Sequence, residues 1–253
     1  MENLSKKELW INPDYSYLFN RTIIEYDMKE AGYSLIKEYE LLPEKTIKKL
    51  ATLSKQNRTI QIGKIQRSNQ ELAKKLSDAF ARARNIFYTM NRLEKEDILS
   101  VKKDAIFTIK SCQITQIGEY VVFRPKNEYT SYLHLDSRLE FYYHPNKHDI
   151  KGIGKDNVAK HEGYMSSILD SFCRRMETEG SSATIDYIIR MIQRYKMREL
   201  DIGYYRTFNQ KSEFIMIDEP DIIYDQLTND YINDIDITYN YFNILLKLVK
   251  IPL

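Results

Sequence analysis

The stretch TIIEYDMKEAGYSLIKEYELL, residues 22–42, changes from a strand pattern to a helix pattern along its length. Its β-type residues predict a strand over 20–28, and apolar residues at helical spacing predict a helix over 30–41. Asp27 lies where the strand pattern ends. Aspartate disfavours strands and is rarely buried without a partner. The stretch therefore predicts a strand and a helix joined at an aspartate with a specific role.

The composition is that of a soluble globular protein. The chain has 253 residues, of which 43% are hydrophobic and 29% charged. It has no apolar run long enough to span a membrane, and its first residues, MENLSKKELW, lack the apolar core of a signal peptide. We therefore expect a cytoplasmic protein without a membrane partner. Cys112 and Cys173 should be reduced, buried thiols.

Charge is distributed unevenly along the chain. Residues 41–110 hold sixteen Lys or Arg against seven Asp or Glu, an excess of nine positive charges. Residues 213–253 hold two basic against eight acidic residues. A basic middle favours a partner that carries phosphate groups, although solvated helix faces would give the same bias.

Periodicity predicts the remaining elements. A second helix opens at Pro43–Glu44, residues 54–64 (SKQNRTIQIGK) form a polar loop, and a long helix runs from about Ser68 to Leu93. Ser68 and Glu71 resemble a capping box at the start of the long helix. Its apolar stripe predicts a buried face, opposite an exposed face formed by Lys74, Lys75, Arg82 and Arg84. Strands should follow over about 98–154, and helices over 155–179, 182–198 and 238–249.

A second aspartate interrupts an apolar strand pattern. In ILSVKKDAIFTIK, residues 98–110, Asp104 has β-type apolar residues on both sides. Mg²⁺ prefers oxygen ligands and is usually held by one or two carboxylates together with substrate phosphates. Two ions about 4 Å apart can stabilise both the attacking and the leaving oxygen in phosphoryl transfer. Asp27 and Asp104 are therefore candidate ligands of a metal site, unless each merely caps a helix or ends a strand.

Both stretches resemble motifs of the family-B DNA polymerases. EYDMKEAGYSLI is similar to motif A, with Asp27 on the metal-binding aspartate and Ser34–Ile36 on its closing Ser-Ile-Ile. SVKKDAIFTI is similar to motif C, with Asp104 on its second aspartate. HDIKGIGKDNVAKHEGYMSSIL resembles the passage from palm to thumb. The resemblance covers residues 20–200 in outline.

The resemblance implies an α+β fold: a polymerase-palm-like antiparallel sheet, a basic helical insertion at about 43–97, and a helical thumb-like C-terminal part. The palm-like domain would span 1–154 and the thumb-like region 155–253. It implies a minimal polymerase without an exonuclease domain, with nucleic acid and nucleoside triphosphate as partners. Asp27 and Asp104 would be catalytic and hold Mg²⁺ or Mn²⁺. The residues expected to contact nucleotide or nucleic acid are Arg58, Lys64, Arg67, Lys103 and Lys151.

The departures from the family pattern leave other functions open. Lys102 replaces the first carboxylate of motif C, and Gly32 falls on the tyrosine that excludes ribose. The fingers motif is not evident, so a protein partner could supply that function. The reduced architecture favours a protein encoded by a phage or mobile element, which would be located in the bacterial host cytoplasm if a phage encodes it. The alternatives are a catalytically inactive palm that binds nucleic acid or a protein, and a two-carboxylate nuclease.

Several single residues have a plainer interpretation than a role in the site. Glu25 shares the strand face of Asp27 and could be a third acidic ligand, but an exposed strand glutamate is the expected reading. Tyr142, Tyr143, Tyr204 and Tyr205 could stack on bases, although such aromatic residues more often belong to a core.

Overall fold

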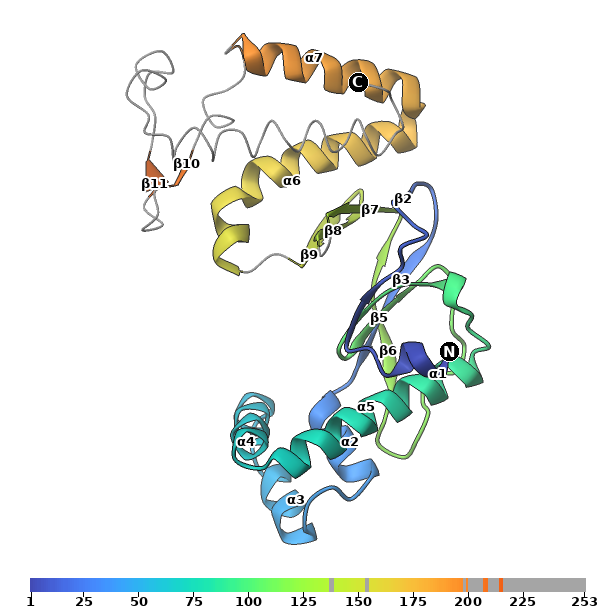
Figure 1. The fold of residues 1–253 in the computed structure, drawn as a ribbon, viewed down its shortest axis with the longest axis vertical. Coiled ribbons are helices and arrows are strands. Elements are labelled where there is room, and N and C mark those ends of the chain that lie inside the picture. The colour runs from blue at the N-terminus through green and yellow to red at the C-terminus, as the bar shows by residue number, and fades with distance from the viewer. Residues whose placement is uncertain (137–138, 153–154, 198, 200–206, 209–213, 216–253) are drawn as a thin grey trace. The chain divides into compact units, whose positions relative to one another are not determined.

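The computed structural model describes residues 1–136, 139–152, 155–197, 199, 207–208 and 214–215 (Figure 1). The chain divides into two compact units. The first comprises residues 1–15 and 22–128, and the second comprises residues 16–21 and 129–253. The domain boundary expected at residue 154 stays a prediction.

The first unit is built on a five-stranded sheet in the order β1-β4-β5-β3-β6. Its strands are β1 (Leu9–Ile11), β3 (Ile23–Met28), β4 (Ile98–Lys102), β5 (Ala105–Thr108) and β6 (Phe123–Tyr129). β1 pairs with β4, β4 with β5, and β5 with β3, each antiparallel. β6 and β1 are the two edges. Pro125 is tolerated in β6 because an edge strand does not need every N–H for a ladder.

The register of the sheet brings the two aspartates together. Asp27, in β3, is opposite Ala105 in β5, which in turn is opposite Lys102 in β4. Lys103 and Asp104 form the two-residue turn between β4 and β5, so Asp104 lies in a turn and not within a strand. The N–H of Met28 donates to the backbone carbonyl of Asp104 at 2.9 Å. Asp27 and Asp104 therefore lie on adjacent strand ends.

Four helices connect β3 with the short 3₁₀ turn η1 (Lys95–Asp97) before β4. They are α2 (Ala31–Glu38), α3 (Glu44–Ala51), α4 (Lys55–Ser68) and α5 (Gln70–Met90). The expectation of a polar loop at 54–64 is wrong, since α4 covers most of it. Ser54 caps this helix by accepting a hydrogen bond from the N–H of Asn57. Ile62 is the single buried residue of α4, so the sequence of this helix shows no clear apolar period. For this reason its pattern indicates a loop.

The start and the exposed face of α5 also differ from expectation. Asn69, and not Ser68, is its N-cap and accepts from the N–H of Leu72 at 3.0 Å. The hydroxyl of Ser68 instead donates to carbonyls in the last turn of α4. Arg84 was expected on the exposed face but is 1% exposed. It stands four residues after Phe80 and four before Tyr88, so it continues the buried stripe.

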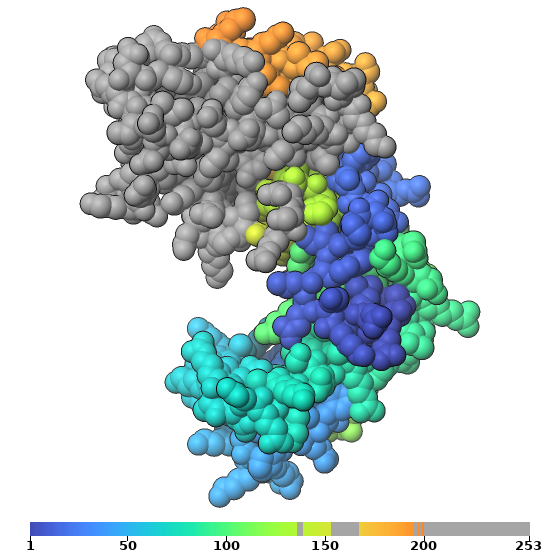
Figure 2. Space-filling model, in the orientation of Figure 1, coloured from blue at the N-terminus to red at the C-terminus, as the bar shows by residue number. Residues whose placement is uncertain are grey.

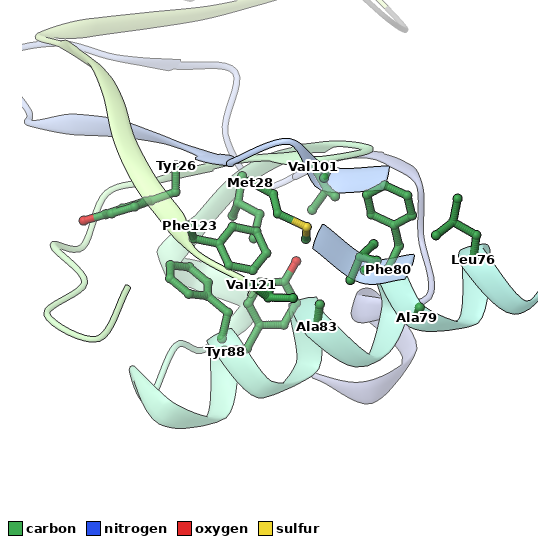
Figure 3. Packing of buried hydrophobic residues seen from close by; sticks show 14 of the residues in the cluster. Tyr26, Met28, Leu76, Ala79, Phe80, Ala83, Tyr88, Val101, Val121 and Phe123 are labelled. Carbon is green, nitrogen blue, oxygen red and sulfur yellow. The ribbon is translucent and has the colours of Figure 1, made fainter. Parts of the chain in front are cut away.

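The core of the first unit lies between α5 and one face of the sheet. Phe87 packs on Phe123 with ring centroids 4.5 Å apart and on Tyr26 at 5.4 Å. Figure 3 shows Ala83 and Tyr88 of α5 pointing toward the side chains of Met28, Val101 and Phe123. The opposite face of β3 carries Glu25 and Asp27, because successive strand residues alternate in direction.

The second unit holds a four-stranded antiparallel sheet in the order β2-β7-β8-β9. Its elements are β2 (Tyr17–Leu18), β7 (Ser131–Asp136), β8 (Leu139–His144), β9 (Lys147–Lys151), the helices α6 (Lys155–Thr178) and α7 (Gly180–Lys196), and the small pair β10 (Thr207–Phe208) and β11 (Phe214–Ile215). Tyr142 and Tyr143 are 0% and 4% exposed, so they belong to the core. Tyr204, Tyr205 and the helix expected at 238–249 lie outside the described residues.

The fold class is confirmed as mixed α+β with antiparallel sheets. Cys112 and Cys173 are both buried and unpaired with each other, as expected. In the described part of the chain, the helices are too short or too polar to cross a membrane.

Phe123→Ala should lower the free energy of unfolding by about 3–5 kcal/mol, because it removes a fully buried ring from the contact with Phe87. Met90→Ala, at a side chain 42% exposed on the same helix as Phe87, should change it by less than about 1 kcal/mol. Urea denaturation followed by circular dichroism measures both. Equal losses in the two variants would contradict this assignment of the core.

Candidate active site

A cavity of about 610 Å³ in the first unit is formed by the ends of β3 and β6, the β4–β5 turn, the start of α2, and α4 and α5. Its polar lining consists of Asp27, Glu30, Tyr33, Lys55, Arg58, Thr59, Gln66, Lys103, Asp104, Arg124 and Lys126. Its other lining residues are Met28, Ala31, Gly32, Ile62, Gly63, Leu76 and Phe80. The cavity thus has a charged wall on the sheet and a mixed wall on the helices, where polar residues such as Lys55 and Arg58 stand beside apolar ones such as Ile62.

Asp27 and Asp104 are both part of the charged wall. Asp27 is partly buried, with 18% of its side chain exposed. The pKa of Asp104 is raised above its usual range, chiefly because burial disfavours the charged form, and the negative charge of Asp27 adds to this effect. The structure therefore brings the two predicted metal ligands together, and the charge of Asp27 raises the cost of charging Asp104.

Two cations from β6 face Asp27. The guanidinium of Arg124 lies 3.5 Å from Oδ2 of Asp27, and Nζ of Lys126 lies 3.6 Å from Oδ1. Lys126 also lies 3.3 Å from Oε1 of Glu25. Partial burial acts to lower the pKa of Lys126, but the carboxylates of Glu25 and Asp27 outweigh it, so the pKa is raised. Lys126 therefore stays protonated beside the two acids.

Glu25 does not fit the expectation of an exposed strand glutamate. It is 1% exposed, and its carboxylate accepts hydrogen bonds from Lys126 and Asn127. A buried carboxylate needs such partners, because an unpaired charge away from water is costly. Glu25 is absent from the cavity lining, so its role in the structure is to hold Lys126 from behind.

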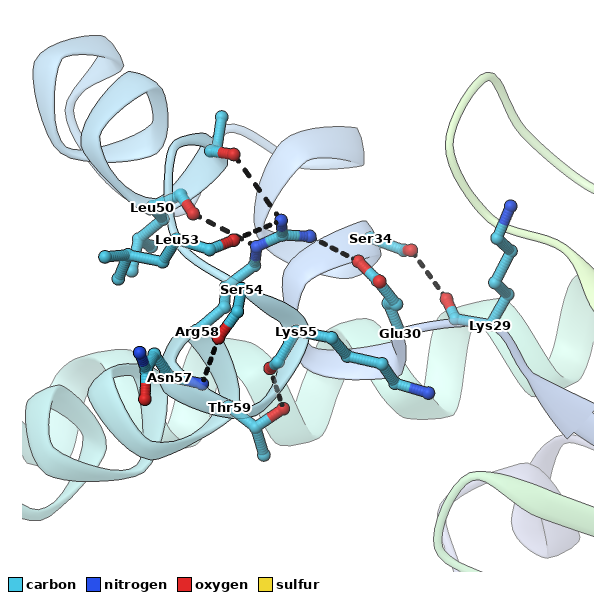
Figure 4. Close-up of polar contacts among 11 residues, drawn as sticks. Lys29, Glu30, Ser34, Leu50, Leu53, Ser54, Lys55, Asn57, Arg58 and Thr59 are labelled. Atoms are coloured by element: carbon cyan, nitrogen blue, oxygen red, sulfur yellow. Dashed lines mark hydrogen bonds and ion pairs between the residues drawn. The ribbon is translucent and has the colours of Figure 1, made fainter.

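Arg58 connects the start of α2 with the end of α3 (Figure 4). It forms an ion pair with Glu30, the N-cap residue of α2, and donates to the carbonyls of Leu50, Ala51 and Leu53. Its guanidinium also lies over the ring of Tyr33, 4.3 Å from the centroid. Arg58 lines the cavity as predicted for a phosphate contact, but its donors are used within the protein, and phosphate contact stays a prediction.

One side of α4 faces the cavity and the other faces solvent. Lys55, Thr59, Ile62 and Gly63 line the cavity at three- and four-residue steps. A Cβ on Gly63 would meet nothing within 4 Å, so the helix leaves open space at that point. Lys64 and Arg67 are exposed and lie outside the cavity lining. Their predicted role in binding phosphate is not supported by a place in this cavity.

The remaining predicted residues are divided between the two units. Lys103 lines the cavity beside Asp104. Lys151 lies in β9 of the second unit and forms an ion pair with Asp149 at 2.6 Å. Lys102 is outside the cavity lining, and the cations beside Asp27 come from β6 instead. Gly32 lines the cavity, and a Cβ there would make only an ordinary contact with Ile62 at 3.6 Å.

Sequence reasoning missed Arg124 and Lys126. Both lie in FRPKNEY, residues 123–129, two positions apart. Two cations with period-two spacing in a strand share one face, which is a usable signal. What the sequence could not supply is the neighbour of that face, because β6 and β3 are about one hundred residues apart in the chain and become adjacent only in the sheet.

The lining residues fit an anionic ligand together with a divalent cation. Five cationic side chains face three carboxylates around the cavity, a formal excess of two positive charges. In the part of the chain that the structure describes, no cluster of three or more acidic, His or Cys side chains forms a complete metal cage. Mg²⁺ seldom needs such a cage, since substrate phosphates and water supply its remaining ligands. Two adjacent carboxylates, one of them made harder to charge by the other, are a suitable donor set.

Comparison with known protein families identifies the chain over its full length. A family model described as the bacteriophage PBS1 gene 130 protein matches residues 1–253, so the chain belongs to this family. The family is named for a phage protein, which agrees with the expected phage setting. No curated protein matches the chain. The match carries no description of an activity.

Asp104→Asn should raise the melting temperature at pH 7 in the presence of EDTA. Because burial raises the folded-state pKa of Asp104, the fold favours its protonated form. The group therefore stabilises the fold only below its ordinary pKa of 3.8, and this contribution is lost as the pH rises through the raised value. The gain of the variant should disappear as the pH falls toward that range.

Asp14→Asn is the control for this prediction. The carboxylate of Asp14 is 60% exposed and pairs with Lys95 at 3.0 Å, so its removal should give no gain at any pH. Thermal melts between pH 3.5 and 8 measure both variants. A wild-type protein that is as stable as Asp104→Asn at pH 7 would show that Asp104 carries no buried charge.

Proposed function

We propose that the protein is a metal-dependent nucleotidyltransferase that resembles a minimal family-B DNA polymerase without an exonuclease domain. The observation that carries this proposal is the placement of Asp27 and Asp104 on adjacent strand ends, at one wall of a cavity with excess positive charge. The antiparallel sheet and the helical insertion that surround them agree with the arrangement that the motif resemblance implies.

The size and the lining of the cavity suit a nucleoside triphosphate. Its volume falls within the roughly 300–1,000 Å³ of ordinary small-molecule sites. Lys55 and Lys103 lie on two sides of the cavity, where they can neutralise phosphate oxygens. Ile62 and Phe80 line the cavity from the helices with 6% and 5% of their surface exposed, so a sugar or a base would meet only their edges. The open space at Gly63 leaves room against the backbone of α4.

Asp27 and Asp104 would hold Mg²⁺ or Mn²⁺, which when bound neutralises charge on the phosphates and on the attacking oxygen. The two aspartates fit this role because both are carboxylates and both line the cavity, while the phosphates of the substrate complete the ligand set. Binding of a cation would also relieve the electrostatic cost that Asp27 imposes on the charged form of Asp104.

In the proposed reaction a primer 3′-hydroxyl attacks the α-phosphorus of the triphosphate. A new phosphorus–oxygen bond forms, the bond to the β-phosphate bridge breaks, pyrophosphate leaves, and the hydroxyl proton passes to solvent. The protein contributes position and charge, which are the main components of phosphoryl-transfer catalysis. Lys103 would contact the leaving phosphates. Phosphate contacts by Arg58, Lys64 and Arg67 and a nucleic-acid contact by Lys151 remain predictions.

A second candidate function rests on the ion pairs of Asp27. Both oxygens of this carboxylate already face cations, Lys126 and Arg124, within 3.6 Å. A site in which lysine and arginine neutralise the carboxylate has less need of a metal ion, which favours a polymerase-derived palm that binds nucleic acid without catalysis. For such binding, the logarithm of the association constant would fall linearly with the logarithm of the salt concentration, because phosphate contacts release counterions.

Primer extension separates these functions. The full chain is incubated with labelled primer–template, nucleoside triphosphates and Mg²⁺ or Mn²⁺. We expect extension, and we expect Asp27→Asn and Asp104→Asn to reduce its rate about a thousandfold, because metal-assisted charge stabilisation is worth several kcal/mol. Asp14→Asn, the same chemical change at an exposed ion pair, should extend like the wild type.

Each alternative predicts a different product. A protein that never extends the primer with either metal, yet binds it with a steep salt dependence, would be the non-catalytic palm. Shortened primer would indicate a nuclease. Binding that is flat in salt would reject nucleic acid as a partner altogether.

A further inference from the structure

Hydrogen bonds from three other segments of the first unit hold the backbone of the turn that carries Asp104. Lys103 has a positive φ of 56°, a conformation that costs energy for a residue with a side chain. Its N–H donates to the carbonyl of Glu8 at 2.6 Å, and its own carbonyl accepts from Arg84 at 2.6 Å. The carbonyl of Asp104 accepts from the N–H of Met28. Strained backbone persists where its surroundings fix it, as they do here.

Arg84 is a large charged side chain buried in the core. It is 1% exposed, its Nε donates to the carbonyl of Ser5 at 2.8 Å, and its Nη1 donates to Lys103. Among the described residues its Nη2 has no hydrogen-bond partner. Burying a guanidinium is costly, and apolar residues of similar size often serve stability as well. The two carbonyls that Arg84 joins therefore account for its presence better than core packing does.

The carbonyl of Ser5 belongs to the N-terminal segment, residues 1–11. Helix α1 (Glu2–Ser5) packs on α5, and β1 pairs with β4. In Figure 2 the dark-blue N-terminal residues lie against green and cyan residues of the same unit. Glu8 binds Lys103 through its backbone and Ser77 of α5 through its carboxylate, at 3.0 Å. The segment thus reaches the Asp104 turn both directly and through Arg84.

We infer that Arg84 is a positioning residue for Asp104. Together with the N-terminal segment, which we call the N-terminal brace, it fixes the Lys103–Asp104 turn so that the Asp104 carboxylate faces the cavity beside Asp27. Arg84 touches neither metal nor substrate and acts through the carbonyl of Lys103. The inference rests on the proposed function for the role of Asp104, but the brace itself is a property of the fold.

The test compares Arg84→Met, which removes both hydrogen bonds, with Arg84→Lys, which keeps the charge and a single donor nitrogen that can serve one of the two carbonyls. Phe87→Leu is the matched control, because it alters an equally buried side chain on the same helix, one turn away and without a bond to the turn. Amide hydrogen exchange at Lys103 and Met28 reports on the turn directly. We expect faster exchange in Arg84→Met, a smaller change in Arg84→Lys, and wild-type exchange at these two amides in Phe87→Leu.

Mn²⁺ binding, measured by calorimetry in the full chain, links the turn to the site. Arg84→Met should bind Mn²⁺ about 10- to 100-fold more weakly, as is typical when the support of a metal ligand is removed. Arg84→Lys should recover part of this loss, and Phe87→Leu should bind like the wild type.

The outcomes separate the inference from the function on which it rests. Exchange at Lys103 and Met28 that is unchanged in Arg84→Met, or equally fast in Phe87→Leu, overturns the brace even if the wild type extends primers. A wild type that neither binds Mn²⁺ nor extends primers rejects the proposed function. Selective loss of protection in Arg84→Met would then still establish the brace.

Discussion

The pairing of β3 with β5 is the constraint on which the candidate site depends. Its register puts Asp27 opposite Ala105, and the hydrogen bond from Met28 to the Asp104 carbonyl extends this pairing into the turn. A shift by one residue would turn Asp27 into the core and Tyr26 toward the cavity, because side chains alternate along a strand. The buried ring of Tyr26, whose hydroxyl accepts from the N–H of Cys112 at 2.7 Å, opposes such a shift.

Charges around the site form a connected set in which each group has a different role. Glu25, buried behind the cavity, holds Lys126, which in turn faces Asp27. Glu30 and Arg58 bind each other and fix the entrance of α2. Lys103 and Asp104, the two residues of the β4–β5 turn, also line the cavity. Neither takes part in the ion pairs just described. The chemistry proposed for the site therefore depends on a few residues that line the cavity, and the other charged residues hold these in place.

The sequence predicted local features well and long-range ones poorly. Periodicity among residues close together in the sequence predicts three features: the strand at Asp27, the apolar stripe of α5 and the strands around Asp104. Helix α4 was missed because Ser54 and Arg58, and not an apolar period, stabilise it. Arg84 was placed on the wrong face because its charge was given more weight than its spacing from Phe80. Arg124 and Lys126 meet Asp27 only through strand pairing, which local patterns do not encode.

The composition of β6 has a consequence for self-association. As an edge of the sheet, this strand presents backbone groups that could pair with the edge of another copy and begin aggregation. Pro125 has no N–H to offer to such a neighbour, and the flanking Arg124 and Lys126 would repel the same charges on a second copy. The opposite edge, β1, is only three residues long. The cations that face Asp27 thus also help to keep the sheet from growing beyond a single chain.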